Sequence, residues 1–300
     1  MISQATCSDP LSGVPTDFSE VSESGVRLQR IAIIGHAAFA LQGKNTRVVS
    51  IGSCAPLQLL APRTGSEVGW LVMGSLGGGL LGGDCIHVDL HVQQGARAYV
   101  TTQASTKIFK SGGCGEVRQS LNVHMAPDAA ILFAPDPVVC FAHADYQQEQ
   151  NFYLHAASSL LAVDWFTSGR WQCGERWKFA RYLSRQSVFI NAAPILIDAL
   201  ELDNTMSNIS NTIGFHAVNA LATVICLGPR FTRAARVLLQ RLHDMPIEPK
   251  DSVIFGISEL ADGFLLRVAG DSTENVGRFL QRELAQAAAV MGVELWLRKW

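Results

Sequence analysis

Two histidines and an aspartate alternate along one short segment of the chain. His87, Asp89 and His91 occupy every second position, with apolar residues between them. Because side chains alternate along a β-strand, this spacing places all three on one face. Imidazole and carboxylate groups are suitable ligands for first-row divalent metal ions. Side chains two positions apart on a strand are about 7 Å apart, so solvation of a polar sheet face explains the trio as well as metal binding does.

A carboxylate, a thiol and an imidazole also lie close together in the sequence. Asp136, Cys140 and His143 fall within one short segment that is otherwise largely apolar. A cysteine beside a base can be a catalytic nucleophile, but no oxyanion loop is recognisable nearby. Free cysteines in apolar surroundings usually pack as small hydrophobic side chains. The segment therefore favours a packed cysteine or a transient metal contact over a catalytic pair.

A cluster of glycines precedes the alternating segment, at 77–84. Exposed amides in such a loop can bind phosphate, yet a dinucleotide-binding loop leads into a helix, whereas the residues after Asp84 alternate like a strand. Gly43-Lys44-Asn45 lacks the first glycine and the Ser or Thr of a P-loop. We therefore expect no nucleotide site, and a close-packed turn in which glycines adopt positive φ.

The charge of the chain is nearly balanced. It has 24 basic and 26 acidic residues and a formal net charge of -2. No net field draws such a protein to nucleic acid or to an anionic membrane surface. Charged residues make up 17% of the chain and apolar residues 48%, which leaves few groups to solvate exposed faces. This balance favours a subunit covered by partner proteins, with a compact monomer as the alternative.

The cysteines and the N-terminus bear on the compartment. The 7 cysteines are scattered and include no CxxC pair, which excludes a zinc ribbon. The N-terminus lacks the basic start and apolar run of a signal peptide, so we expect a cytoplasmic protein with reduced thiols. The most membrane-like stretch, between Glu67 and Asp84, is 16 residues long and rich in glycine, too short to span a bilayer.

Short alternating segments broken by turn residues dominate most of the chain. Residues 1–25 are polar and rich in Pro and Gly, and they predict a mobile tail. Residues 26–300 are expected to form one domain, with a β-rich body at 26–203 and a helix-strand-helix portion at 210–300. The clearest strand is 85–92, where apolar residues occupy one face and polar residues the other.

A weak repeat begins in that strand. Leu90-His91-Val92, Val123-His124-Met125 and Leu154-His155-Ala156 are spaced 33 and then 31 residues apart. Each is followed by a short turn and another apolar strand. We therefore expect three stacked hairpin units, as in a β-roll or solenoid, which would place His124 beside the metal-ligand candidates.

Two helices are predicted near the C-terminus. Apolar residues recur at helical spacing from Phe231 to Leu242. The second helix starts at a capping sequence, Asp271-Ser272-Thr273-Glu274, and ends at Gly292. Between them, 252–257 and 264–269 predict a hairpin. The predicted fold is mainly β, with stacked sheets and two C-terminal α-helices.

Several motifs occur in the order found in a known protein family. They are Gly78 to Asp84, Thr101-Thr102-Gln103, 106–110, 135–141, Ser168-Gly169-Arg170, and Gly174-Glu175-Arg176-Trp177 with Phe179. In this order, the region 77–201 resembles the UreD (UreH) family of urease accessory proteins. The set is far more specific than any one motif in it.

The resemblance implies a mostly β fold and a non-enzymatic role. Proteins of that family bind UreF, which recruits the GTPase UreG, and the assembly docks on apo-urease to support nickel insertion. We therefore expect UreF, UreG and apo-urease as partners, with a dimeric arrangement within the complex left open. We expect no nucleic-acid or membrane partner and no tightly bound cofactor, but a transient nickel ion. The missing P-loop agrees with a separate GTPase.

Charged residues within the matched motifs are the first candidates for that role. Asp84, Lys107 and Glu175 lie among apolar or glycine residues, and with Cys140 and His143 they are expected to line a nickel path or a docking surface. The alternative for the two carboxylates is structural, because a buried carboxylate can accept backbone amides or pair with a neighbouring cation.

Two other functional classes stay open at this point. A β-solenoid hydrolase would use Asp84 and Glu175 as acid and base, held within about 10 Å of each other in a cleft. A carbohydrate- or peptide-binding module would need an exposed groove lined by aromatic residues.

Overall fold

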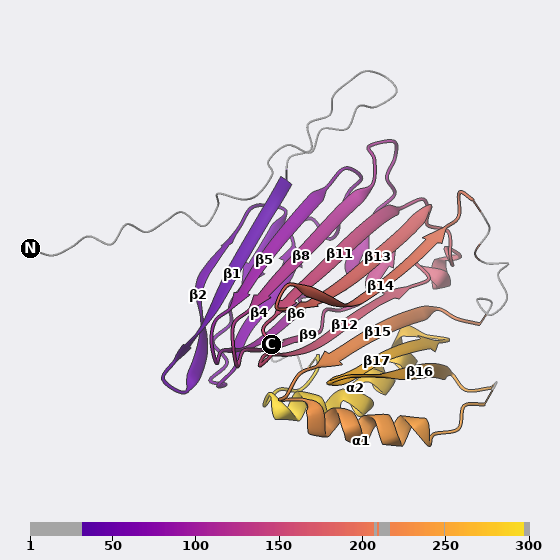
Figure 1. The fold of residues 1–300 in the computed structure, drawn as a ribbon. Coiled ribbons are helices and arrows are strands. Elements are labelled where there is room, and N and C mark those ends of the chain that lie inside the picture. The colour runs from indigo at the N-terminus through magenta and orange to yellow at the C-terminus, as the bar shows by residue number, and fades with distance from the viewer. Residues whose placement is uncertain (1–31, 207–208, 210–216, 249, 297–300) are drawn as a thin grey trace, which may run out of the picture.

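The computed structural model describes residues 32–206, 209, 217–248 and 250–296. Most of this chain forms two β-sheets that face one another (Figure 1). The tail predicted at 1–25 lies outside the described residues. No described helix is both long enough and apolar enough to cross a bilayer.

Sheet A has 7 strands in the order β14-β13-β11-β8-β5-β1-β2. Its strands are β1 (Ala32–Gln42), β2 (Asn45–Ser53), β5 (Cys85–Val92), β8 (Val117–Met125), β11 (Asp145–Leu154), β13 (Arg181–Ile190) and β14 (Ala193–Asp203). The strands from β1 to β13 run parallel to one another, whereas the edge strands β2 and β14 are antiparallel to their neighbours. The strand predicted at 85–92 is β5, so that prediction is confirmed.

Sheet B follows the order β16-β17-β15-β12-β9-β6-β4-β3, and short strand β10 joins it by pairing with β12 and β7. Its strands are β3 (Leu57–Leu60), β4 (Gly69–Ser75), β6 (Arg97–Thr102), β7 (Thr106–Ile108), β9 (Ala130–Phe133), β10 (Val138–Cys140), β12 (Ser159–Thr167), β15 (Ala220–Leu227), β16 (Val253–Leu260) and β17 (Gly263–Gly270). Strands β4, β6, β9 and β12 are parallel.

The chain winds between the two sheets in stacked coils. From β5, β8 and β11 it crosses through a short turn into β6, β9 and β12 of the other sheet, and then returns. The predicted solenoid-like stacking is confirmed. The predicted hairpins are wrong, because the two strands of each unit lie in different sheets and pair with equivalent strands of neighbouring coils. In this arrangement the apolar faces of the two strands pack against each other.

The register of the third repeat also differs from the prediction. His91 and His124 are direct partners in β5 and β8, as expected. The residue opposite His124 in β11 is Tyr153, whereas His155 follows the end of that strand. Phe152 is fully buried and must face the core, and since side chains alternate, this fixes Tyr153 on the outer face.

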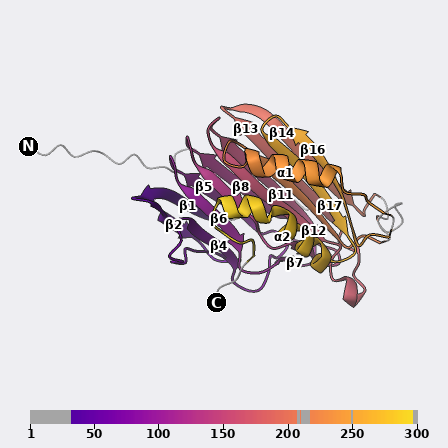
Figure 2. The same ribbon diagram turned by 90° about the horizontal axis from the view of Figure 1, so that it is seen from below.

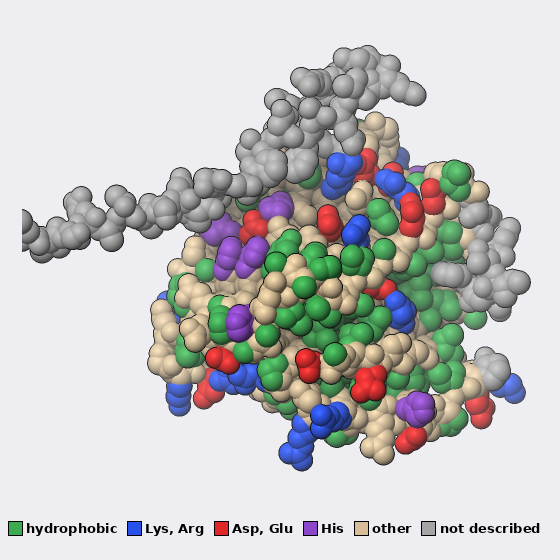
Figure 3. Space-filling model, in the orientation of Figure 1, with side chains coloured by type: hydrophobic (Ala, Val, Ile, Leu, Met, Phe, Trp, Pro, Cys, Tyr) green, Lys and Arg blue, Asp and Glu red, His purple; other side chains and the backbone are tan. Residues whose placement is uncertain are grey.

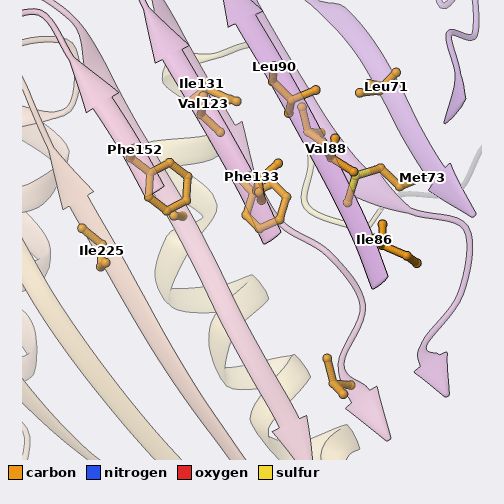
Figure 4. Packing of buried hydrophobic residues seen from close by; sticks show 14 of the residues in the cluster. Leu71, Met73, Ile86, Val88, Leu90, Val123, Ile131, Phe133, Phe152 and Ile225 are labelled. Atoms are coloured by element: carbon orange, nitrogen blue, oxygen red, sulfur yellow. The ribbon is translucent and has the colours of Figure 1, made fainter. Parts of the chain in front are cut away.

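The main core lies between the sheets (Figure 4). Leu90, Val123 and Phe152 point inward from successive strands of sheet A, and Ile131 and Phe133 meet them from β9. Each of these side chains is at most 3% exposed. Burying a side chain of this size stabilises the fold by about 1.5–3 kcal/mol, so the coils are held together mainly by this apolar layer.

Two helices cover the outer face of sheet B, α1 (Thr232–His243) and α2 (Thr273–Val290) (Figure 2). The Ser272 hydroxyl accepts a hydrogen bond from the Asn275 amide and caps α2, as the sequence predicted. The predicted hairpin is β16–β17. Strand β15 was not predicted, because its continuous apolar run carries no alternation when both faces are buried.

Candidate functional site

Polar side chains enter the space between the sheets next to the apolar core. The Nε2 group of Gln148 donates to both carboxylate oxygens of Asp164, at 2.7 and 2.8 Å. The Ser184 hydroxyl donates to the same carboxylate at 2.8 Å. The Tyr146 hydroxyl joins Gln148 to Gln119 through contacts of 3.1 and 3.0 Å. These groups form one hydrogen-bonded network that spans β8, β11, β12 and β13.

Asp164 is the ionisable centre of this network, 7% exposed. Burial disfavours the charged carboxylate and raises its pKa, while the hydrogen bonds from Ser184 and Gln148 act in the opposite direction. The net result is a raised pKa.

Three cavities follow the network through the molecule. The largest, of about 560 Å³, lies between β13–β14 and β15–β17, and Asp164, Ser184 and Gln186 line it. A void of about 20 Å³ lies next to Gln148 and Gln119. Gln119 also lines a third cavity of about 170 Å³ beside the glycine loop. Polar side chains therefore connect the open edge of the sheets to the glycine-rich end.

An ion pair crosses the mouth of the largest cavity. Arg267 of β17 contacts Asp198 of β14, so the pair joins sheet B to sheet A. The Arg267 side chain is 57% exposed and Asp198 only 15%. The guanidinium end of the pair is therefore accessible to solvent, while the carboxylate is largely enclosed.

The glycine loop packs against neighbouring coil corners. The Leu80 amide donates to the Lys107 carbonyl at 2.8 Å, and the Phe141 amide donates to the Ile108 carbonyl at 2.9 Å. A Cβ on Gly82 would lie 2.4 Å from the Ser111 carbonyl oxygen, so only glycine allows this approach. The predicted close-packed turn is confirmed, and the structure brings the sequence motifs together at this corner.

The two carboxylates singled out in the sequence have structural partners here. Asp84 accepts the Leu81 amide at 2.8 Å and closes the glycine turn. Glu175 accepts from the Arg170 guanidinium at 2.8 Å and from the Ala142 amide at 3.2 Å. The hydrogen bond from Arg170 holds the pKa of Glu175 below its ordinary value.

The remaining motif candidates lie on the paired strands β7 and β10 and in the turn that follows, but their side chains have different surroundings. Lys107 is exposed and lines the 170 Å³ cavity. Cys140 is buried, and burial raises the pKa of its thiol, which keeps it protonated. His143 is exposed and has a φ of 63°. This environment does not favour thiolate chemistry at Cys140.

The histidine-rich face forms a row across sheet A. His87 contacts Ser120 through Nδ1 at 2.6 Å and Asp89 through Nε2 at 2.9 Å. The His91 ring stacks on the His124 ring, with 4.9 Å between centroids, and His124 stacks on Tyr153 at 4.8 Å. Within the described part of the chain, no group of three or more His, Cys, Asp or Glu side chains is arranged to hold a metal ion.

Sequence reasoning missed the interior network. Tyr146, Gln148 and Gln150 share the inward face of β11 with Phe152 and Leu154, so polar and apolar residues occupy the same alternating positions. One feature of the sequence could have indicated the network: glutamines occupy inward positions on a strand that also carries a buried aromatic residue. The role of these glutamines depends on Asp164, which lies on a strand of the opposite sheet.

Comparison with known proteins gives consistent matches along most of the chain. A family model described as "UreD urease accessory protein" matches residues 35–300. A urease accessory protein UreD of Anaeromyxobacter sp. (strain Fw109-5) is 41% identical over 254 residues, which cover 84% of each chain. A urease accessory protein D of Oryza sativa subsp. indica is 32% identical over 265 residues, covering 79% of this chain and 86% of that protein. Its counterpart in Arabidopsis thaliana is 30% identical over 280 residues, covering 83% and 95%.

Proposed function

Because this chain belongs to the UreD family of urease accessory proteins, we propose that it is a non-enzymatic scaffold and nickel-transfer chaperone in urease maturation. In this proposal it acts in the cytoplasm with UreF and the GTPase UreG to insert nickel into apo-urease. Nickel is the cargo of this process, and it stays bound only transiently.

The polar network between the sheets carries the proposal. It links a cavity of about 560 Å³ at one edge to one of about 170 Å³ at the glycine loop. The groups that could bind a metal ion there are the side-chain amide oxygens of Gln119 and Gln148, hydroxyl groups, and the Asp164 carboxylate. Oxygen donors of this kind hold nickel more weakly than thiolates or imidazoles do, so a cation is released onward rather than retained. Passage through a chain of weak sites is how selective pores conduct ions.

The glycine corner is the proposed docking end of the path. Lys107 lines the cavity there, and Asp84 and Glu175 fix the loops around it through the contacts described above. Cys140 and His143 lie in the strand and turn next to this corner. In the proposal, Lys107 and His143 lie on the docking surface. Asp84, Glu175 and the buried Cys140 support this surface, and Asp164 is the main ligand inside the path.

A gene deletion with complementation tests the proposal. We expect urease from the deletion strain to be inactive and poor in nickel, and the full chain to restore both properties. The tagged chain should also co-purify with UreF and UreG from its own source. Normal nickel content in the deletion strain, together with a chain that purifies alone, would contradict the scaffold role.

A further inference from the structure

Strand β14 leaves one edge of sheet A unpaired. It runs over Ala193–Asp203 and, among the described residues, pairs only with β13. The other side of an edge strand presents main-chain N–H and C=O groups that can pair with an additional strand.

The opposite edge of the same sheet is covered where its edge strand begins. In β2, the Thr46 amide donates to the Glu67 carbonyl at 2.8 Å, and Arg47 donates to the Ser66 carbonyl at 3.3 Å. Strand β14 lacks comparable protection, because it contains no Lys or Arg and its one proline, Pro194, is its second residue. The inward Asp198 does not guard this edge, since Arg267 pairs with it.

Apolar side chains lie on both sides of the free edge. Ile195 and Ile197 point outward and are 48% and 53% exposed. On the inner side, Leu200 lines the 560 Å³ cavity together with Ile254 of β16. Hydrophobic side chains gather on the face where β13 and β14 lie (Figure 3). A strand added here would find apolar contacts for both of its alternating faces.

The charges of β14 select among possible occupants. The strand carries Asp198, Glu201 and Asp203 and no basic side chain. In full-length antiparallel pairing of two copies of β14, with residue 193 opposite residue 203, Asp198 would face the Asp198 of the second copy, and like charges in facing strands are destabilising. A second copy of this chain is therefore disfavoured, and a basic segment is favoured.

We propose that β14 binds an extended segment of a partner protein as an additional strand of sheet A. The segment carries apolar side chains on both of its faces. Those on the outer face pack on Ile195 and Ile197, and those on the inner face pack on the cavity wall. A basic side chain on the segment faces Glu201. This mode of recognition takes its affinity from main-chain hydrogen bonds and its specificity from alternate side chains. The segment would contact the wall of the cavity from which the proposed nickel path starts, but its binding can be tested separately, because it requires no metal and no urease.

A peptide assay on the full-length chain tests this inference. The probe is a short, fluorescently labelled synthetic peptide with valines on both of its alternating faces, threonines between them and a lysine near each end. We expect it to bind, and we expect the Ile195→Lys/Ile197→Lys variant to bind it at least about tenfold more weakly, because lysines on an edge repel a basic strand. A peptide with methylated backbone amides should lose as much affinity, since it cannot donate to the ladder.

The matched control is Val49→Lys/Ile51→Lys on β2, where the wild-type side chains are 45% and 41% exposed. This variant should bind the peptide like the wild type, and circular dichroism should show that both variants are folded. Hydrogen exchange should show new protection of β14 amides in the complex. Absence of binding to the wild type, equal binding of the methylated peptide, or loss of binding only with Ile254→Lys would each overturn the assignment to β14. Self-association of the chain that the β14 lysines abolish would also overturn it, in favour of a second copy.

Discussion

Asp164 is a carboxylate enclosed between two sheets, and its hydrogen bonds compensate only part of the free energy of burying a charge. Gln148 and Ser184 donate to it, yet its pKa stays raised. An ionisable group at such a position needs a reason beyond stability, since an apolar residue of similar volume would cost less. The proposed transfer of a divalent cation supplies that reason.

Replacing this carboxylate should separate nickel transfer from folding. Asp164→Asn keeps the volume and removes the charge, so we expect a folded protein and a several-fold lower rate of nickel loading of urease. The measurement is nickel content and activity of urease in the complemented deletion strain. Asp128→Asn is the control, because Asp128 is exposed and lies outside the network. Unchanged loading with Asp164→Asn would show that the ion does not pass Asp164.

The same variant should change how stability depends on pH. The pKa of Asp164 in the folded protein lies above its ordinary value of 3.8, and the unfolded chain regains that value. Between the two pKa values the folded state holds a proton that the unfolded state has lost, so wild-type stability falls as pH rises through this window. Asparagine does not titrate. Urea unfolding at a series of pH values should therefore show that Asp164→Asn gains stability relative to the wild type as pH rises through the window. A difference in unfolding free energy that stays constant with pH would contradict the raised pKa of Asp164.

At the scale of single elements, the coil corner depends on close approach of backbones. A methyl group at Gly82 would meet the Ser111 carbonyl at 2.4 Å, and backbone atoms cannot move aside as a flexible side chain does. We expect Gly82→Ala to lower the free energy of unfolding by about 1–3 kcal/mol, as overpacked sites do.

The control for this corner is Gly256→Ala in β16. A Cβ at Gly256 would meet no heavy atom within 4 Å, so this substitution should leave stability nearly unchanged. Chemical denaturation of both variants makes the comparison. Equal stability of the two variants would mean that the corner relaxes without cost.

At the scale of the whole molecule, the end of the described chain is tied back to sheet B. The indole N–H groups of Trp296 and Trp165 both donate to the Pro135 carbonyl, at 3.0 and 2.8 Å. The two rings lie 5.3 Å apart between centroids. The Trp296 amide also donates to the Tyr99 hydroxyl at 3.1 Å. The C-terminal segment therefore shields part of the outer face of sheet B.

Removing this tie should weaken the complete fold. Because Trp296 is only half-buried, we expect Trp296→Ala to cost about 1–3 kcal/mol, less than truncation of a fully buried tryptophan. Trp171→Ala is the matched control, since Trp171 is 42% exposed and should tolerate truncation. Thermal unfolding of the two variants, followed by tryptophan fluorescence, checks the difference. A larger effect at Trp171 would contradict the role given to Trp296.

Elements whose pattern is local could be predicted from the amino-acid sequence. Alternation fixed β5 at its full length, and the capping serine and helical spacing located α2. The glycine run identified a tight turn, because the conformational freedom of glycine is a property of the residue itself. The motif order from 77 to 201 identified the family that the comparisons then matched.

The tertiary structure decided which residues meet. It placed Tyr153 rather than His155 beside His124, because burial of the large side chains in each coil sets the register. It brought Asp164 to Gln148 across the gap between two sheets, a contact that no periodicity in either strand encodes. Among the described residues no strand lies beyond β14, which follows from the order in which the coils stack. Local sequence determines the face that a residue occupies, whereas its neighbour on that face depends on how the coils pack on each other.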